Sequence, residues 1–121
     1  MKESKKQLRK MLQKPQISKK VKKQLKEFDW GANVRAHQYS KLKHDRYDAL
    51  ALLTELVKES NYDWRVLTSQ KQLINNLKTN RASLNFDLLS LDRLGMIHVD
   101  LTQLAKGQDH FSCEIIPHKV F

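Results

Sequence analysis

The spacing of apolar residues divides the chain into a short helical first part and a longer second part. In the first part, apolar residues recur at intervals of three or four, as on one side of a helix: Ile17, Val21, Leu25 and Phe28. Residues 3–14 permit a second helix with a narrower apolar side, which Pro15 ends, and residues 31–44 show no firm period. The first part is therefore predicted as two short helices followed by a linker.

A stronger helical pattern begins the second part of the chain. Asp45 and Asp48 are residue types that favour a helix N-terminus, where their negative charge is stabilised. The apolar residues after them keep a helical spacing and predict a helix to about residue 60: Ala49, Leu50, Leu53, Leu56 and Val57. Residues 64–67 are too few for a helix and indicate a brief strand.

Two further helices, joined by a polar turn at residues 79–80, are predicted next. Thr68 or Ser69 caps the first of them, whose apolar residues are Leu73, Ile74 and Leu77. The second spans about 81–94, and its buried positions follow at intervals of four and three: Leu84, Leu88, Leu91 and Leu94. Gly95 is the expected stop at its C-terminus.

After Gly95 the period of the apolar residues changes from that of a helix to two, as in a strand. The residues expected on one side of a first strand are Ile97, Val99 and Leu101. Residues 106–109 form a polar loop with a turn-forming glycine, and residues 111–115 alternate as a second strand that Pro117 ends. The patterns together predict a mainly α fold with a small β-hairpin, which is an α+β domain.

One part of the chain has a pattern that is typical of a known family. It consists of positions 67–100, LTSQKQLINNLKTNRASLNFDLLSLDRLGMIHVD, followed by the 106–109 loop and a strand at 111–116. In the order of its predicted elements the chain resembles the winged helix-turn-helix superfamily of DNA-binding proteins. The resemblance implies a winged helix-turn-helix, with the hairpin as its wing, over about 45–117. It divides the chain into a basic helical arm with a linker, 1–44, and a winged-helix domain, 45–121.

The charge of the chain is concentrated in its first part. The 121 residues carry a formal net charge of +10, and this charge lies within residues 1–48, because acidic and basic side chains balance in 49–121. Such an asymmetry favours nucleic acid as partner over an acidic protein, a membrane surface or no partner at all. The arm lysines expected to contact phosphates are Lys19, Lys20, Lys22, Lys23 and Lys26. The apolar side of their helix is expected to pack on the domain or on a second copy of the chain.

The resemblance also implies which residues would contact duplex DNA. In the family, the second helix of the helix-turn-helix lies in the major groove, and here that helix is 81–94. Base contacts are expected from Arg81, Ser83, Asn85 and Phe86. Phosphate and wing contacts are expected from Gln70, Lys71, Lys78 and Lys106. Because this helix is only weakly basic, most of the affinity is expected to come from the arm.

An alternative hypothesis uses the same surface for protein binding. Phe86 and Leu89 are apolar residues expected on the outward or half-outward side of the 81–94 helix. They could dock on a protein partner while the basic arm binds an acidic surface. The winged helix would then be a protein–protein interaction module.

Several other kinds of site find no support in the sequence. No phosphate-binding loop, nucleophile motif, carboxylate pair or metal quartet is present, so neither an enzyme nor a cofactor is expected. His98 and His110 could face each other across the hairpin, but no metal site is predicted. Cys113, the one cysteine, is expected as a buried thiol in a reducing compartment. No apolar run is long enough to span a membrane, and the first residues lack the apolar stretch of a secretory signal.

Together these patterns predict a small cytoplasmic protein that binds double-stranded DNA as a homodimer. Its use would be transcriptional regulation, or an accessory role in the replication or transfer of a mobile element such as a plasmid or phage. The sequence leaves both uses open.

Overall fold

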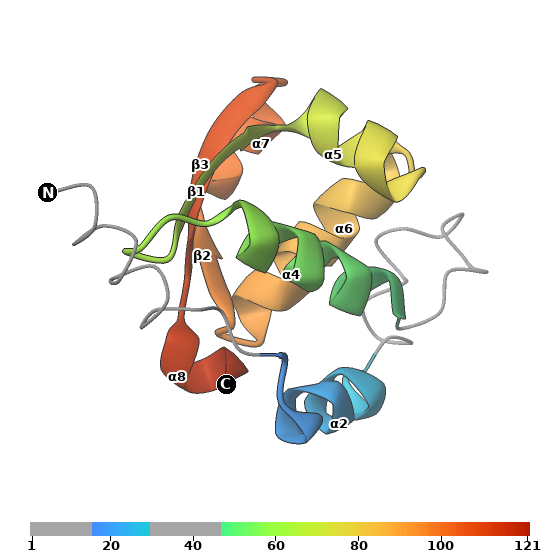
Figure 1. Cartoon of the computed structure of the whole chain (residues 1–121). Coiled ribbons are helices and arrows are strands. Elements are labelled where there is room, and N and C mark those ends of the chain that lie inside the picture. The colour runs from blue at the N-terminus through green and yellow to red at the C-terminus, as the bar shows by residue number, and fades with distance from the viewer. Residues whose placement is uncertain (1–15, 30–46) are drawn as a thin grey trace, which may run out of the picture.

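The structure is a computed structural model, and it describes residues 16–29 and 47–121 (Figure 1). Its helices and strands are, in order, α2 Lys19–Glu27, α4 Tyr47–Glu59, β1 Arg65–Ser69, α5 Gln70–Leu77, α6 Arg81–Arg93, β2 Ile97–Val99, α7 Leu101–Ala105, β3 His110–Ile115 and α8 Pro117–Val120. The three strands form one antiparallel sheet, so the described chain has the α+β class that the sequence predicts. The helix predicted at 3–14, the linker at 31–44 and the cap at Asp45 lie outside the described residues.

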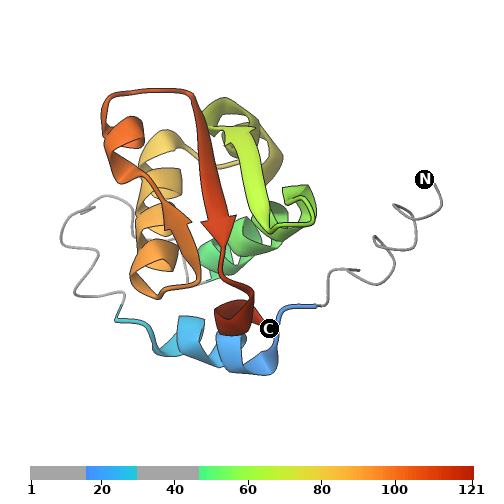
Figure 2. The ribbon, with the colours of Figure 1, turned by 90° about the vertical axis from the view of Figure 1, so that its left-hand side faces the viewer.

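The sheet has the strand order β1-β3-β2, with β3 between its two neighbours (Figure 2). Val66 of β1 and Val99 of β2 both lie opposite Cys113 of β3. Buried and exposed residues alternate along β2 and β3, so one face of the sheet is turned to the core. In Figure 2 the sheet faces the viewer and α4, α5 and α6 lie behind it.

The core lies between this face of the sheet and helices α4 and α6. Leu84, Leu88 and Leu91 of α6 are buried, as their spacing predicts, together with leucines of α4. Leu50 and Leu94, which belong to the same predicted apolar sides, are only partly buried at the edge of the core. The helix–helix part of the core is therefore confirmed, with α6 packed against α4, α5 and β2.

Side-chain caps fix the starts of α5 and α6. Ser69, rather than Thr68, caps α5, and its side chain accepts a hydrogen bond from the Gln72 amide at 3.1 Å. Asn80 caps α6 in the same way by accepting from the Ser83 amide at 2.8 Å. Each bond satisfies a backbone donor that has no partner within its own helix, which is why the helices begin at these residues.

The predicted stop at Gly95 is confirmed. Gly95 has a φ of 76°, a left-handed conformation that costs glycine little. Its amide donates to the Asp92 carbonyl, and the amide of Met96 donates to the Leu91 carbonyl. This pair of bonds is the Schellman motif that ends α6 and turns the chain into β2.

Strand β1 is longer than the strand predicted at residues 64–67, and β2 is shorter than the strand predicted from Ile97 to Leu101. β1 continues to Ser69, because β3 offers pairing partners as far as His110. The prediction that Leu101 continues the second strand is wrong, since Leu101 begins α7. Asp100 caps α7 by accepting from the Thr102 amide at 3.0 Å, and this bond turns the chain out of the strand.

Helix α2 packs its apolar side on the same core. Val21 and Leu25 are 1% and 2% exposed and belong to the core cluster, and α2 lies against α4. Ser18 caps α2 by accepting from the Val21 amide, and its hydroxyl donates to the Val120 carbonyl at 3.2 Å. The predicted packing of this side on the domain is therefore confirmed, with α2 beside α8 at one end of the molecule (Figures 1 and 2).

Candidate nucleic-acid interface

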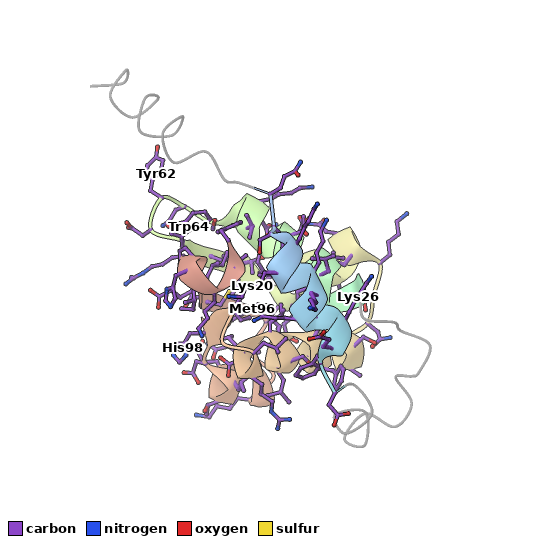
Figure 3. All side chains as sticks on the ribbon, turned by 90° about the horizontal axis from the view of Figure 1, so that it is seen from below. Lys20, Lys26, Tyr62, Trp64, Met96 and His98 are labelled. Atoms are coloured by element: carbon purple, nitrogen blue, oxygen red, sulfur yellow. The ribbon has the colours of Figure 1, made fainter. Side chains whose placement is uncertain are left out.

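The lysines of α2 form a surface that faces away from the core. Because Val21 and Leu25 turn one side of this nine-residue helix inward, the other sides are left outward. All five lysines predicted to contact phosphates are exposed: Lys19, Lys20, Lys22, Lys23 and Lys26. Figure 3 shows α2 in front of the domain, with Lys20 and Lys26 on it. We call these five residues the lysine face.

Two lysines from distant parts of the sequence lie near the lysine face. Lys58, near the end of α4, lines a groove together with Lys22. Lys119 is exposed on α8, and the next residue, Val120, is hydrogen-bonded to the cap of α2. Neither lysine stands in a basic run, so the sequence assigned no role to them. The packing of α2 on α4 and α8 brings Lys58 and Lys119 near the lysine face.

A second group of exposed basic residues follows α5 and the turn to α6. Lys71 lies in the first turn of α5, Lys78 directly follows its end, and Arg81 begins α6. Their side chains are exposed, as predicted. Lys78 has a left-handed backbone with a φ of 53°, and its amide donates to the Ile74 carbonyl at the end of α5. These three positive charges are therefore accessible to a ligand.

Helix α6 presents less of its surface than the sequence predicts. Ser83 and Phe86 are expected outward, but they are only 3% and 6% exposed, and Ser90 is also buried. The helix is covered by α4, α5 and β2, whereas the spacing of its leucines indicates only one buried side. The Ser90 hydroxyl donates to the Phe86 carbonyl at 2.9 Å, which satisfies this polar group inside the fold. The prediction that Ser83 and Phe86 reach DNA bases is therefore wrong for this structure.

The remaining positions on that side of α6 are half-buried. The Oδ1 atom of Asn85 is buried and accepts no hydrogen bond from the described residues. Leu89 is likewise half-buried. The docking surface of the alternative hypothesis thus lacks Phe86. Of the four predicted base contacts, only Arg81 has an exposed side chain.

The chain between β2 and β3 folds back onto the start of α5. The Gln70 amide donates to the Asp109 carbonyl at 2.8 Å, and the Lys71 amide donates to Asp109 Oδ1 at 3.0 Å. The side chain of Gln70 is 0% exposed, and its Nε2 donates to the Gln108 carbonyl at 3.0 Å. Gln70 therefore links two segments inside the fold, and its predicted contact with a phosphate is wrong. The buried side of β1 continues into this residue, which turns a polar side chain inward.

The same connection differs from the open polar loop that the sequence predicts. It contains α7, and Leu104 of this short helix is buried in the core. Gly107, with a φ of 77°, supplies a left-handed turn after α7. Lys106 is exposed beside it, as predicted for a wing residue. The connection is thus a folded segment that carries the exposed Lys106 and contacts the start of α5 through Gln108 and Asp109.

The two histidines of the sheet do not face each other. His98 of β2 lies opposite Glu114, whereas His110 itself belongs to β3 and lies opposite Ser69 of β1, so the two positions are four residues apart along β3. His98 instead has its Nδ1 atom 3.9 Å from Asp92 Oδ1. Within residues 16–29 and 47–121, no group of His, Cys, Asp and Glu side chains could hold a metal ion.

Cys113 is a buried thiol on β3, as predicted. Burial raises its pKa to about 12, and the negative charge of Glu59 acts in the same direction. Such a thiol is almost entirely protonated at neutral pH, and only the thiolate is a good nucleophile. Cys113 is therefore a packing residue.

Among the described basic residues, eight thus form two exposed groups, the lysine face and the group of Lys71, Lys78 and Arg81. Both groups can neutralise phosphates, and neither includes a nucleophile. In the part of the chain that the structure describes, no helix has the length and apolar character needed to cross a membrane. Comparisons of this chain with protein-family models, with curated proteins and with solved structures found no match.

Proposed function

We propose that this protein binds duplex DNA, with α5 and α6 as a helix-turn-helix, the connection between β2 and β3 as its wing, and the lysine face as its main source of affinity. The order α4, β1, α5, α6, β2, β3 and the sheet order β1-β3-β2 support the proposal. This is the order of elements that the resemblance to winged helix-turn-helix proteins implies. In such proteins the second helix of the motif approaches the major groove.

The observation that carries the proposal is that α2 packs on the core with its lysine face turned outward. Val21 and Leu25 hold α2 on the core, so its lysines project from a folded helix at fixed spacing. Each lysine that neutralises a phosphate lowers the slope of log affinity against log salt concentration by about 0.9. Five such contacts would account for a slope of about −4.5. The affinity would therefore depend strongly on salt.

Binding in this arrangement is directed mainly at the phosphate backbone. Because Ser83 and Phe86 are buried and Asn85 is half-buried, α6 offers few side chains to base edges. Phosphate contacts position a protein on the duplex but carry no sequence information directly. Arg81, which could donate two hydrogen bonds to guanine, is the main source of sequence preference in the proposal.

The proposal includes the two uses that the sequence leaves open, transcriptional regulation and an accessory role in replication or transfer of a mobile element. It also includes a homodimer, because a second copy doubles the phosphate contacts on one duplex. Cytoplasmic action is part of it as well, since a free thiol persists in a reducing compartment.

The experiment measures affinity for a fluorescent duplex of about 20 base pairs at several salt concentrations. When Lys19, Lys20 and Lys23 are replaced by Gln, we expect the slope to become shallower by about 2.7. Glutamine is a good helix former, so α2 keeps its fold. Arg65→Gln is a control that removes one positive charge outside the lysine face, because Arg65 is exposed on β1. An unchanged slope in the triple variant would show that the lysine face does not contact phosphates.

A further inference from the structure

A groove between α2 and α4 is not explained by DNA binding. It has a volume of about 460 Å³. On the side of α2 it is lined by Gln16, Ile17 and Lys22, and on α4 by Leu50, Thr54, Val57 and Lys58. The α4 residues recur at helical intervals and therefore share one side of that helix. A pocket volume of about 300–1,000 Å³ is usual for small ligands and also suits a few side chains of a peptide.

The floor of the groove is apolar. Ile17 and Leu50 pack on the core but are only partly buried, and Val57 is buried next to them. The hydroxyl of Thr54 donates its proton to the Leu50 carbonyl at 2.8 Å, so its oxygen remains a hydrogen-bond acceptor. A phosphate would gain nothing from this floor. An apolar side chain followed by a backbone N–H would fit it.

The edges of the groove are positively charged. Lys22 contributes one charge from α2 and Lys58 another from α4, and no acidic side chain is among the described residues that line the groove. Charges of one sign around an apolar floor favour a partner that combines an apolar side chain with negative charge. They disfavour a basic partner by repulsion.

We propose that this groove docks an acidic peptide segment of a partner protein. A bulky apolar side chain of the segment enters between Ile17 and Leu50, and carboxylates beside it pair with Lys22 and Lys58. A backbone N–H of the segment donates to the Thr54 oxygen. An amphipathic segment that lays its apolar side in a groove is a common form of peptide recognition. This inference does not depend on DNA binding, although both use Lys22.

The test has to separate docking in the groove from general attraction to the lysine face. Thr54→Arg does so, because it adds a positive charge but fills the groove with a long side chain. General attraction predicts equal or tighter binding of an acidic peptide, whereas docking predicts weaker binding. Thr54 is exposed on α4 and arginine favours helix, so the fold tolerates the change. The matched control is Gln24→Arg, which adds the same charge at an exposed position of α2 outside the groove.

The probe is a fluorescein-labelled peptide of about 14 residues, with Leu at every third or fourth position among Glu residues, and binding is followed by anisotropy. We expect Thr54→Arg to weaken binding at least about tenfold and Gln24→Arg to change it by less than about twofold. A second peptide with Ser in place of each Leu is expected to bind the native protein at least about tenfold more weakly.

Three results would each overturn the proposal. These are no binding of the first peptide, equal affinity of Thr54→Arg and native protein for it, and equal affinity of the native protein for both peptides. Binding of phosphatidylglycerol vesicles that Thr54→Arg abolishes, without peptide binding, would assign the groove to a membrane surface instead.

Discussion

Replacing Gln70 with Ala distinguishes a structural role of this residue from a role in DNA binding. The side chain is 0% exposed, and its Nε2 donates to the Gln108 carbonyl at 3.0 Å. Its Oε1 atom is buried and has no partner among the described residues. Because the side chain connects the start of α5 to the segment before β3, its removal is expected to lower the free energy of unfolding.

The size of the effect follows from these contacts. Leaving the Gln108 carbonyl without its donor costs about 2 kcal/mol. Removing the buried stem of the side chain costs about 1 kcal/mol more, at ~0.8 kcal/mol for each buried CH₂ group. Removing the unpartnered Oε1 regains about 1 kcal/mol. We therefore expect Gln70→Ala to cost about 2 kcal/mol, and Gln70→Met, which keeps the stem, to cost about 1 kcal/mol.

Urea unfolding followed by tryptophan fluorescence measures this cost. Trp64 packs on Phe121 with ring centroids 5.2 Å apart, so its surroundings change when the protein unfolds. At a slope of about 1.5 kcal/mol per molar urea, a loss of 2 kcal/mol lowers the midpoint by about 1.3 M. Asn75→Ala is the control, because Asn75 is exposed on the same helix. Equal midpoints for Gln70→Ala and Asn75→Ala would refute the structural role. Weaker DNA binding at unchanged stability would support a phosphate contact instead.

Three other substitutions or reactions test single features of the fold. Lys78→Gly is expected to raise the free energy of unfolding by about 1 kcal/mol, because Lys78 has a φ of 53° and glycine adopts this conformation without a Cβ clash. The melting temperature is then expected to rise, and a lower melting temperature would contradict this. Cys113 is expected to react with a thiol reagent at pH 8 only after unfolding, since burial raises its pKa to about 12, and rapid reaction of the folded protein would be evidence against its burial. Glu59→Gln is expected to raise the urea midpoint at pH 7 but not at pH 4. Burial, and after it the charge of Glu55, raises the pKa of Glu59 above 4.5, so its contribution to stability is present below pH 4.5 and is lost as the pH rises through the pKa in the folded state. The same shift at both pH values would argue against this cause.

The exposure of the charged residues of the candidate site could be predicted from the sequence. Lys71, Lys78 and Arg81 are exposed as expected, because a charged side chain is seldom fully buried unless it is paired. The same inference fails for neutral polar residues. Gln70 and Ser83 are buried, and burial of such groups costs little once their hydrogen bonds are made. Residue type alone therefore does not decide whether neutral polar residues are buried or exposed.

The sequence by itself determined the local elements of this protein. The spacing of Leu84, Leu88 and Leu91 gives the inner side of α6, Gly95 gives its end, and Val21 with Leu25 gives the inner side of α2. These features depend on residues within a few positions of one another, so the order of residues is enough to specify them.

Only the tertiary structure decided which surfaces are left for partners. The neighbours of α6 bury Phe86, Asp109 draws the segment before β3 onto α5, and the packing of α2 on α4 sets Lys58 across a groove from Lys22. Each of these outcomes joins residues from different elements. The spacing of apolar residues within one helix indicates one buried side of that helix. It does not indicate how many neighbouring elements cover the helix.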